Sequence, residues 1–353
     1  MENVQNGFGL TQHQLELLHN MQIKKTEADI MAEKNCEKRA LKEKWLKLWV
    51  KSLKDGIDNN SGKDAFNKYS ALITLNNAIR EEISADSNNL VWYYISIIEC
   101  ELFIPYFPLG NTEEDKNLKK IKYTQKNFTE EFVNAHGVVT GEYIQRISKQ
   151  YKKIIDKLDK KTMKLAMAVI STAAITALTF GVATYFAPAI AVALVGESFA
   201  GLSGIALTNA CLAMLGGGAV EAGGAGIAGG IAAIAGGGSI FGFTIGGTAA
   251  AATTAVFWNP EYAITNIAKF ELVIKEVFLN VQHDVKYSQE CISAYKAKIR
   301  EMEDYIEELQ RNEKENKKEI KNLAKTLSYM QSAYIELNKF CSAFDIRMQY
   351  TEG

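Results

Sequence analysis

The sequence is poor in the patterns that mark metal sites, nucleic-acid-binding surfaces and secreted domains. Its four histidines form no H-x-x-x-H or H-E-x-x-H arrangement, and its five widely spaced cysteines form no metal-binding pair. The 40 basic and 41 acidic residues give a formal net charge of −1, so no basic excess favours nucleic acid as a partner. The first residues lack the basic and apolar blocks of a classical signal peptide. We therefore expect a protein made in the cytoplasm, with reduced cysteines and without a bound metal or cofactor.

Nucleotide-binding motifs are missing as well, although glycine is abundant. A P-loop needs G-x-x-x-x-G-K-[ST], but the one Gly-Lys pair, which starts at Gly62, is followed by Asp64. The spacing of Gly224, Gly226 and Gly229 resembles a dinucleotide fingerprint, yet no alternation of strands and helices surrounds it. A Gly-x-Ser-x-Gly elbow does not occur either. These absences argue against an enzyme.

Charge is almost absent from one long stretch. The 94 residues from Leu165 to Trp258 contain two charged side chains, Glu197 and Glu221, and most of the chain's 26 glycines. About 18 to 25 apolar residues in a row suffice to cross a bilayer as a helix, so this hydrophobic run is long enough for as many as four crossings. Because its glycine clusters would interrupt helices, one hairpin of two long, broken helices is an equal alternative. The run predicts a lipid bilayer as a partner.

The glycines of the run are spaced for close helix packing. Gly226 and Gly230 are four residues apart, and Gly238, Gly242 and Gly246 continue that spacing. Small residues at every fourth position leave a helix face bare, so that a second helix can approach closely in lipid. We expect these five glycines to pack helices together, within a hairpin or between protomers of a homo-oligomer.

Charged and aromatic residues mark the middle and the borders of the run. An ionisable group at membrane depth is costly and often functional, so Glu221 is a candidate pore-lining residue, while Glu197 suits a turn at the interface. Lysines before the run can attract anionic lipid, and an aromatic residue after it can anchor at the interface. These flanking residues are Lys157, Lys160, Lys161, Lys164 and Trp258. The alternative for the lysines is an ordinary solvated helix face.

The rest of the chain predicts helices and no strand. We expect helices over Gln12–Leu53, Ala65–Ser84 and Leu90–Leu102, and a further one from Glu130 into the run, with loops at Asp55–Gly62 and Pro105–Lys116. After the run, apolar residues alternate spacings of three and four from Ile292 to Leu309 and again from Ile320 to Cys341, as heptad positions do. This segment predicts one continuous rod over Glu261–Thr351, or an antiparallel hairpin that turns at Arg311–Lys318.

The predicted fold class is therefore all-α: an elongated helical bundle with long coiled-coil-like helices and a Gly/Ala-rich hydrophobic segment that inserts into a membrane. Three parts are expected. Residues 1–163 form an N-terminal portion of the bundle, residues 164–260 form the hydrophobic segment, and residues 261–353 form long heptad helices that complete the bundle.

This order of parts resembles the α-helical pore-forming toxins of bacteria, of the cytolysin A and haemolysin BL type. The resemblance is architectural: Leu165–Trp258 corresponds to the hydrophobic head and Glu261–Phe344 to the long helices. It implies a soluble form that releases its head into a bilayer as protomers assemble, in some cases with a second protein component. The alternatives are a constitutive integral membrane protein whose coiled coil recruits or tethers a partner, and a coiled-coil scaffold without lipid affinity.

Overall fold

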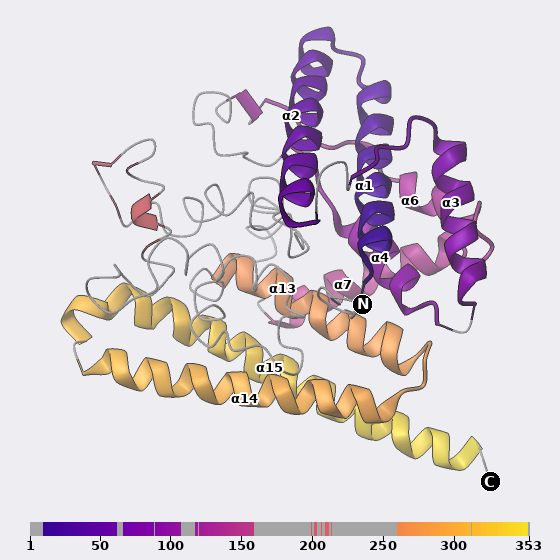
Figure 1. The fold of residues 1–353 in the computed structure, drawn as a ribbon. Helices are drawn as coiled ribbons and strands as arrows, with labels where there is room; N and C mark the ends of the chain where they lie inside the picture. The colour runs from indigo at the N-terminus through magenta and orange to yellow at the C-terminus, as the bar shows by residue number, and fades with distance from the viewer. Residues whose placement is uncertain are drawn as a thin grey trace.

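The computed structural model confirms the all-α class. It describes residues 10–61, 66–87, 89–106, 117–118, 120–158, 260–311 and 313–351, together with eight positions between 199 and 213. Within these residues nine α-helices and one π-helix have defined bounds. None of the described residues lies in a β-strand, and Figure 1 shows how the helices are arranged. Among the helices of this described part, none combines the length and the apolar character needed to cross a membrane.

The first two helices form an antiparallel pair where one long helix was predicted. Helix α1 spans Gln12–Ala32 and α2 spans Cys36–Ser61 (Figure 1). The break follows from local polar chemistry: Glu33 adopts extended backbone angles, and the side chain of Asn35 accepts a hydrogen bond from the Lys38 amide at 2.9 Å, as an N-terminal cap does. The loop predicted at Asp55–Gly62 is wrong for residues 55–61, which form the end of α2.

Four further helices precede the hydrophobic run. They are α3 at Leu72–Ala85, α4 at Val91–Leu102, α6 at Phe128–Val133 and α7 at Gly141–Leu158. The α4 prediction is confirmed to within one residue. The helix expected from Ala65 begins only at Leu72, and the helix expected from Glu130 is split by a turn that contains Gly137 in the left-handed region, with φ of +73°. Glycine is the residue that adopts this conformation without steric cost.

The C-terminal helices fold back on one another, so the continuous rod is wrong. The order is α13 at Pro260–Val273, a π-helix η4 at Ile274–Leu279, α14 at Val285–Gln310 and α15 at Glu313–Thr351. The first break includes His283, whose φ of +55° ends helical geometry without glycine or proline. The second break, at Arg311, lies within the predicted turn. Figure 1 shows α14 and α15 side by side as the antiparallel hairpin, which the sequence left open as the alternative to the rod.

The heptad positions of both helices of the hairpin are largely buried. On α14, Ile292, Ile299 and Met302 are at most 6% exposed, and on α15 Leu323 and Leu337 are fully buried. A single hydrophobic core takes residues from the N-terminal helices and from α13, α14 and α15. The two ends of the chain thus build one helical body in the described residues. The domain boundaries at 163 and 260 stay a prediction, because the residues on the inner side of both are outside the described part.

Candidate functional site

The two helices that border the hydrophobic run, α7 and α13, pack against each other. Helix α7 ends at Leu158 and α13 begins at Pro260. Helix α7 is strongly two-sided, because its apolar residues recur at helical spacing and are buried while its basic residues are mostly exposed. The buried face consists of Ile144, Ile147, Tyr151, Ile154 and Ile155.

Two side-chain contacts show that α7 and α13 run antiparallel. The Tyr151 hydroxyl donates a hydrogen bond to the Thr265 carbonyl at 3.3 Å, near the start of α13. Earlier in α7, Arg146 forms an ion pair of 2.8 Å with Glu276, which lies beyond the end of α13 in η4. Because the earlier residue of one helix meets the later residue of the other, the end of α7 and the start of α13 lie at the same end of the pair. We call this end of the helix pair the base of the run.

A third helix contacts α7 close to the base. Lys157 Nζ donates to Glu336 Oε2 of α15 at 2.9 Å, and this hydrogen bond raises the pKa of the lysine and lowers that of the glutamate. The Lys157 side chain is 62% exposed, so the pair contributes at most about 1 kcal/mol to stability. The ion pair instead fixes a position, because it joins the last turn of α7 to the C-terminal hairpin.

A buried ion pair ties α13 to α4. Glu99 of α4 and Lys269 of α13 form an ion pair of 2.8 Å, with side chains 5% and 3% exposed. Burial raises the pKa of Glu99, although Lys269 opposes that shift. Buried pairs of this kind add little net stability but penalise any arrangement that separates the partners. The pair therefore fixes where α13, and with it the base of the run, sits on the bundle.

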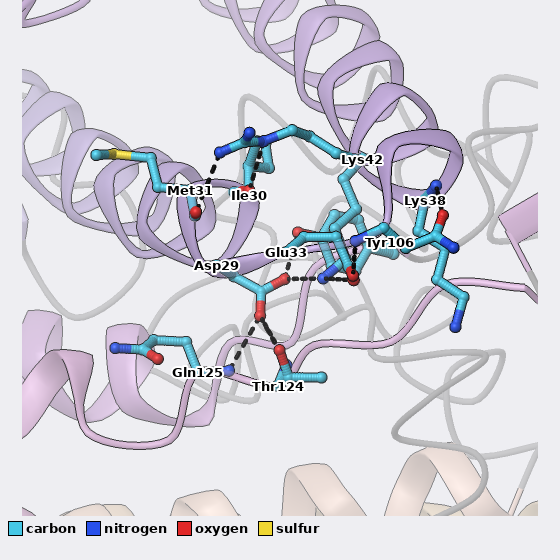
Figure 2. A network of polar contacts seen from close by, with 11 residues as sticks. Asp29, Ile30, Met31, Glu33, Lys38, Lys42, Tyr106, Thr124 and Gln125 are labelled. Atoms are coloured by element: carbon cyan, nitrogen blue, oxygen red, sulfur yellow. Dashed lines mark hydrogen bonds and ion pairs between the residues drawn. The ribbon is translucent and has the colours of Figure 1, made fainter.

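The densest polar cluster lies elsewhere, around Asp29 of α1 (Figure 2). Asp29 Oδ2 accepts hydrogen bonds from Lys42 Nζ and from the Tyr106 hydroxyl, both at 2.7 Å. Asp29 Oδ1 accepts from the Thr124 amide at 2.7 Å, the Thr124 hydroxyl at 2.9 Å and the Gln125 amide at 3.0 Å. The cluster therefore connects α1 and α2 with two segments that have no helical structure.

The electrostatics of this Asp29 cluster favour the charged form of the carboxylate. Burial raises the pKa of Asp29, but the hydrogen bonds from Lys42, Tyr106 and Thr124 outweigh it and lower the pKa overall. Five donors fill the acceptor sites of the carboxylate, which leaves no lone pair directed at a ligand. Tyr106 has a φ of +73°, a strained conformation for a large side chain, and its ring packs on Trp45 and under Lys42. We interpret the cluster as a structural contact that holds α1, α2 and the two non-helical segments together, and not as a reactive centre.

Two histidines are also buried. His136 Nε2 lies 3.2 Å from Asn76 Oδ1, an acceptor, so this nitrogen carries the proton and Nδ1 accepts from the Tyr93 hydroxyl at 3.0 Å. Burial lowers the pKa of His136 to about 4, and nearby Arg80 adds to the shift. Burial likewise lowers the pKa of His19 on α1 to about 4, although the hydrogen bond of its Nδ1 to Gln22 Oε1, at 3.1 Å, raises the pKa. Both rings are thus held neutral near physiological pH.

Most of the predicted site residues lie outside the described part of the chain. These are Gly226, Gly230, Gly238, Gly242, Gly246, Glu221, Lys160, Lys161, Lys164 and Trp258. Lys157 is described, and its ammonium group is engaged by Glu336. Sequence reasoning did not find the Asp29 cluster. In the described residues, no group of three or more His, Cys, Asp or Glu side chains is arranged to hold a metal ion.

Comparisons with known proteins found no match for the chain. No family model matches it, and neither a curated protein nor a solved structure does. The class is therefore defined by the described residues and the sequence: a helical body in which a long run with only two charged residues lies between two antiparallel helices.

Proposed function

We propose that this protein is a helical pore-forming or membrane-disrupting protein, a toxin component or an intracellular effector, that inserts its hydrophobic run into a bilayer and oligomerises there. One observation carries the proposal: a run of 94 residues with two charges lies in the sequence between α7 and α13, and the end of α7 and the start of α13 lie at the same end of that helix pair. An inserted segment whose two ends stay on the same side of a membrane crosses it an even number of times. A hairpin or a set of four crossings meets that condition.

The physical mechanism is a balance between two states of the run. In the soluble state its apolar surface is covered by protein, and in the inserted state lipid and neighbouring protomers cover it instead. A switch of this kind requires that the two states be close in free energy. Glycine-rich helices suit it, since they pack closely in either state but propagate weakly in isolation. The action is non-catalytic and needs no cofactor.

Dye release from liposomes tests the proposal. Detergent-free protein is added to vesicles loaded with a quenched dye, and the same samples are floated on a density gradient to score binding. We expect both release and flotation. Flotation without release would contradict pore formation and favour the constitutive membrane protein with a tethering coiled coil. Soluble protein that gives neither result would overturn both membrane functions.

A substitution at Gly242 tests the packing role of the glycines. Gly242→Leu places a large side chain on the bare helix face, and overpacking a close contact costs about 1–3 kcal/mol, so we expect dye release to fall by about 10-fold or more. Helicity by circular dichroism should stay as in the parent chain. The matched control is Ile240→Leu, which conserves volume two residues away. Equal dye release by Gly242→Leu and Ile240→Leu would contradict a packing role for the glycines.

A further inference from the structure

Three lysines of α7 are exposed on the side of the helix away from the core. Lys152 and Lys153 follow Lys149 at three and four residues, so both lie next to Lys149 on one side of the helix. The opposite face of α7 is buried against α13 and the rest of the bundle. Within the described residues, no carboxylate lies within 4.0 Å of any of the three ammonium groups. We call these residues the α7 lysine face.

The acidic groups around this face are few, and most are already engaged. Glu276 is paired with Arg146, Glu336 with Lys157, and Glu130 of α6 accepts a hydrogen bond of 2.6 Å from Gln145. On α7 itself, Glu142 and Asp156 lie seven residues before and after Lys149, so they share its side of the helix, and the face carries three lysines against these two carboxylates. The three lysines therefore keep a local excess of positive charge that faces solvent.

The position of the lysine face, close to the base of the run, indicates which partner it would contact. Lys149 lies nine residues before the end of α7 at Leu158, or about 14 Å at 1.5 Å per residue, and Lys153 lies about 8 Å before it. An upright α7 would bring only Lys153 within about one Debye length, roughly 8 Å, of the end of the helix. Because the buried face of α7 is opposite the lysines, an α7 that lies along the bilayer surface brings all three lysines to the lipid phosphates. Charge and position thus match a surface of anionic headgroups.

We propose that the α7 lysine face docks the protein on anionic phospholipids and holds the base of the run at the headgroup layer. The inference rests on the proposed membrane function and names the lipid class that it requires. A basic residue near an anionic leaflet contributes about 1 kcal/mol, which is roughly a 5-fold change in partitioning per lysine. Lys157 contributes less while Glu336 engages it, so the face depends mainly on the three unpaired lysines.

The test compares two variants that lose the same charge. The first replaces the face by Lys149→Gln, Lys152→Gln and Lys153→Gln. The control removes three exposed lysines from other elements: Lys34 between α1 and α2, Lys122 before α6 and Lys286 at the start of α14. Flotation with phosphatidylserine-containing vesicles should show about 100-fold weaker binding for the first variant and at most a few-fold change for the control. Equal binding by the two variants would overturn the proposal.

Two further arms separate recognition of a headgroup surface from general adhesion to lipid and from binding of free phosphate. Wild-type protein should bind pure phosphatidylcholine vesicles about as weakly as the face variant binds anionic ones, and inorganic phosphate at matched ionic strength should not compete. Strong binding to neutral vesicles, or displacement by phosphate, would contradict a headgroup surface. Dye release in the same samples distinguishes the lysine-face proposal from the proposed pore-forming function. If the face variant binds as well as the wild type and still releases dye, only the lysine-face proposal is wrong. Lysine-dependent binding without release removes only pore formation.

Discussion

Replacing Asp29 with alanine is expected to lower the free energy of unfolding by about 3–5 kcal/mol, the cost of breaking a buried charge pair from one side. The change leaves the Lys42 ammonium, which is fully buried, without its closest carboxylate and removes the acceptor of the Thr124 and Gln125 amides. Glu33, 3.1 Å from Lys42, compensates only in part. Urea unfolding followed by circular dichroism measures the loss as a shift of the midpoint at constant slope.

Two comparisons make the Asp29 result interpretable. Asp304→Ala on the exposed face of α14 removes a carboxylate that no described residue engages, and should change stability by no more than about 0.5 kcal/mol. Adding Lys42→Met to Asp29→Ala should recover part of the loss, because the orphaned charge is then removed. A loss below about 1 kcal/mol for Asp29→Ala would show that the Asp29 cluster contributes little to the fold.

Acidification is expected to destabilise the helical body through His19 and His136. Each has a folded-state pKa of about 4, below the ordinary 6.5, because burial disfavours the charged ring. The unfolded chain therefore binds more protons between these values, so stability falls as pH drops through 6.5 towards 4. From neutral pH to about pH 5 the two histidines together account for a loss of about 4 kcal/mol, at 1.36 kcal/mol per pKa unit.

Urea unfolding at a series of pH values measures this effect. His19→Gln with His136→Gln should flatten the dependence. The variants are needed because burial raises the pKa of Glu99 and Glu271, and these groups act in the opposite direction as pH falls. A parent chain and double variant with the same pH dependence would contradict the neutral, buried state assigned to the two rings.

The sequence predicted the features that depend on local periodicity. Apolar residues spaced by three and four bury one helix face, and this pattern predicted core residues of α14 and α15, such as Ile299 and Leu337, while it left a rod and a hairpin open. Helix ends were predicted less well. The chain turns between α1 and α2 and again at His283 without glycine or proline, so the usual breaking residues give no warning there.

The Asp29 cluster could not be predicted because its members come from distant parts of the chain. Asp29, Lys42, Tyr106 and Thr124 meet through tertiary packing, and the Asp29 to Thr124 contacts bridge 95 residues of sequence. Each residue alone resembles an ordinary surface or helix position. The predicted glycine face and Glu221 lie outside the described residues, so the membrane role assigned to them stays a prediction.

Because α7 and α13 meet at the base of the run, the hydrophobic run can change without a change in the helices on either side of it. Because the body closes the chain at one end of a helix pair, the cost of an insertion there is mainly loop-closure entropy, which rises by only about 0.6 kcal/mol for each doubling of length. The run can therefore lengthen, shorten or change composition over evolution while the helices that carry it keep their core. Selection can therefore act on the stability of the helical body and on the sequence of the run independently.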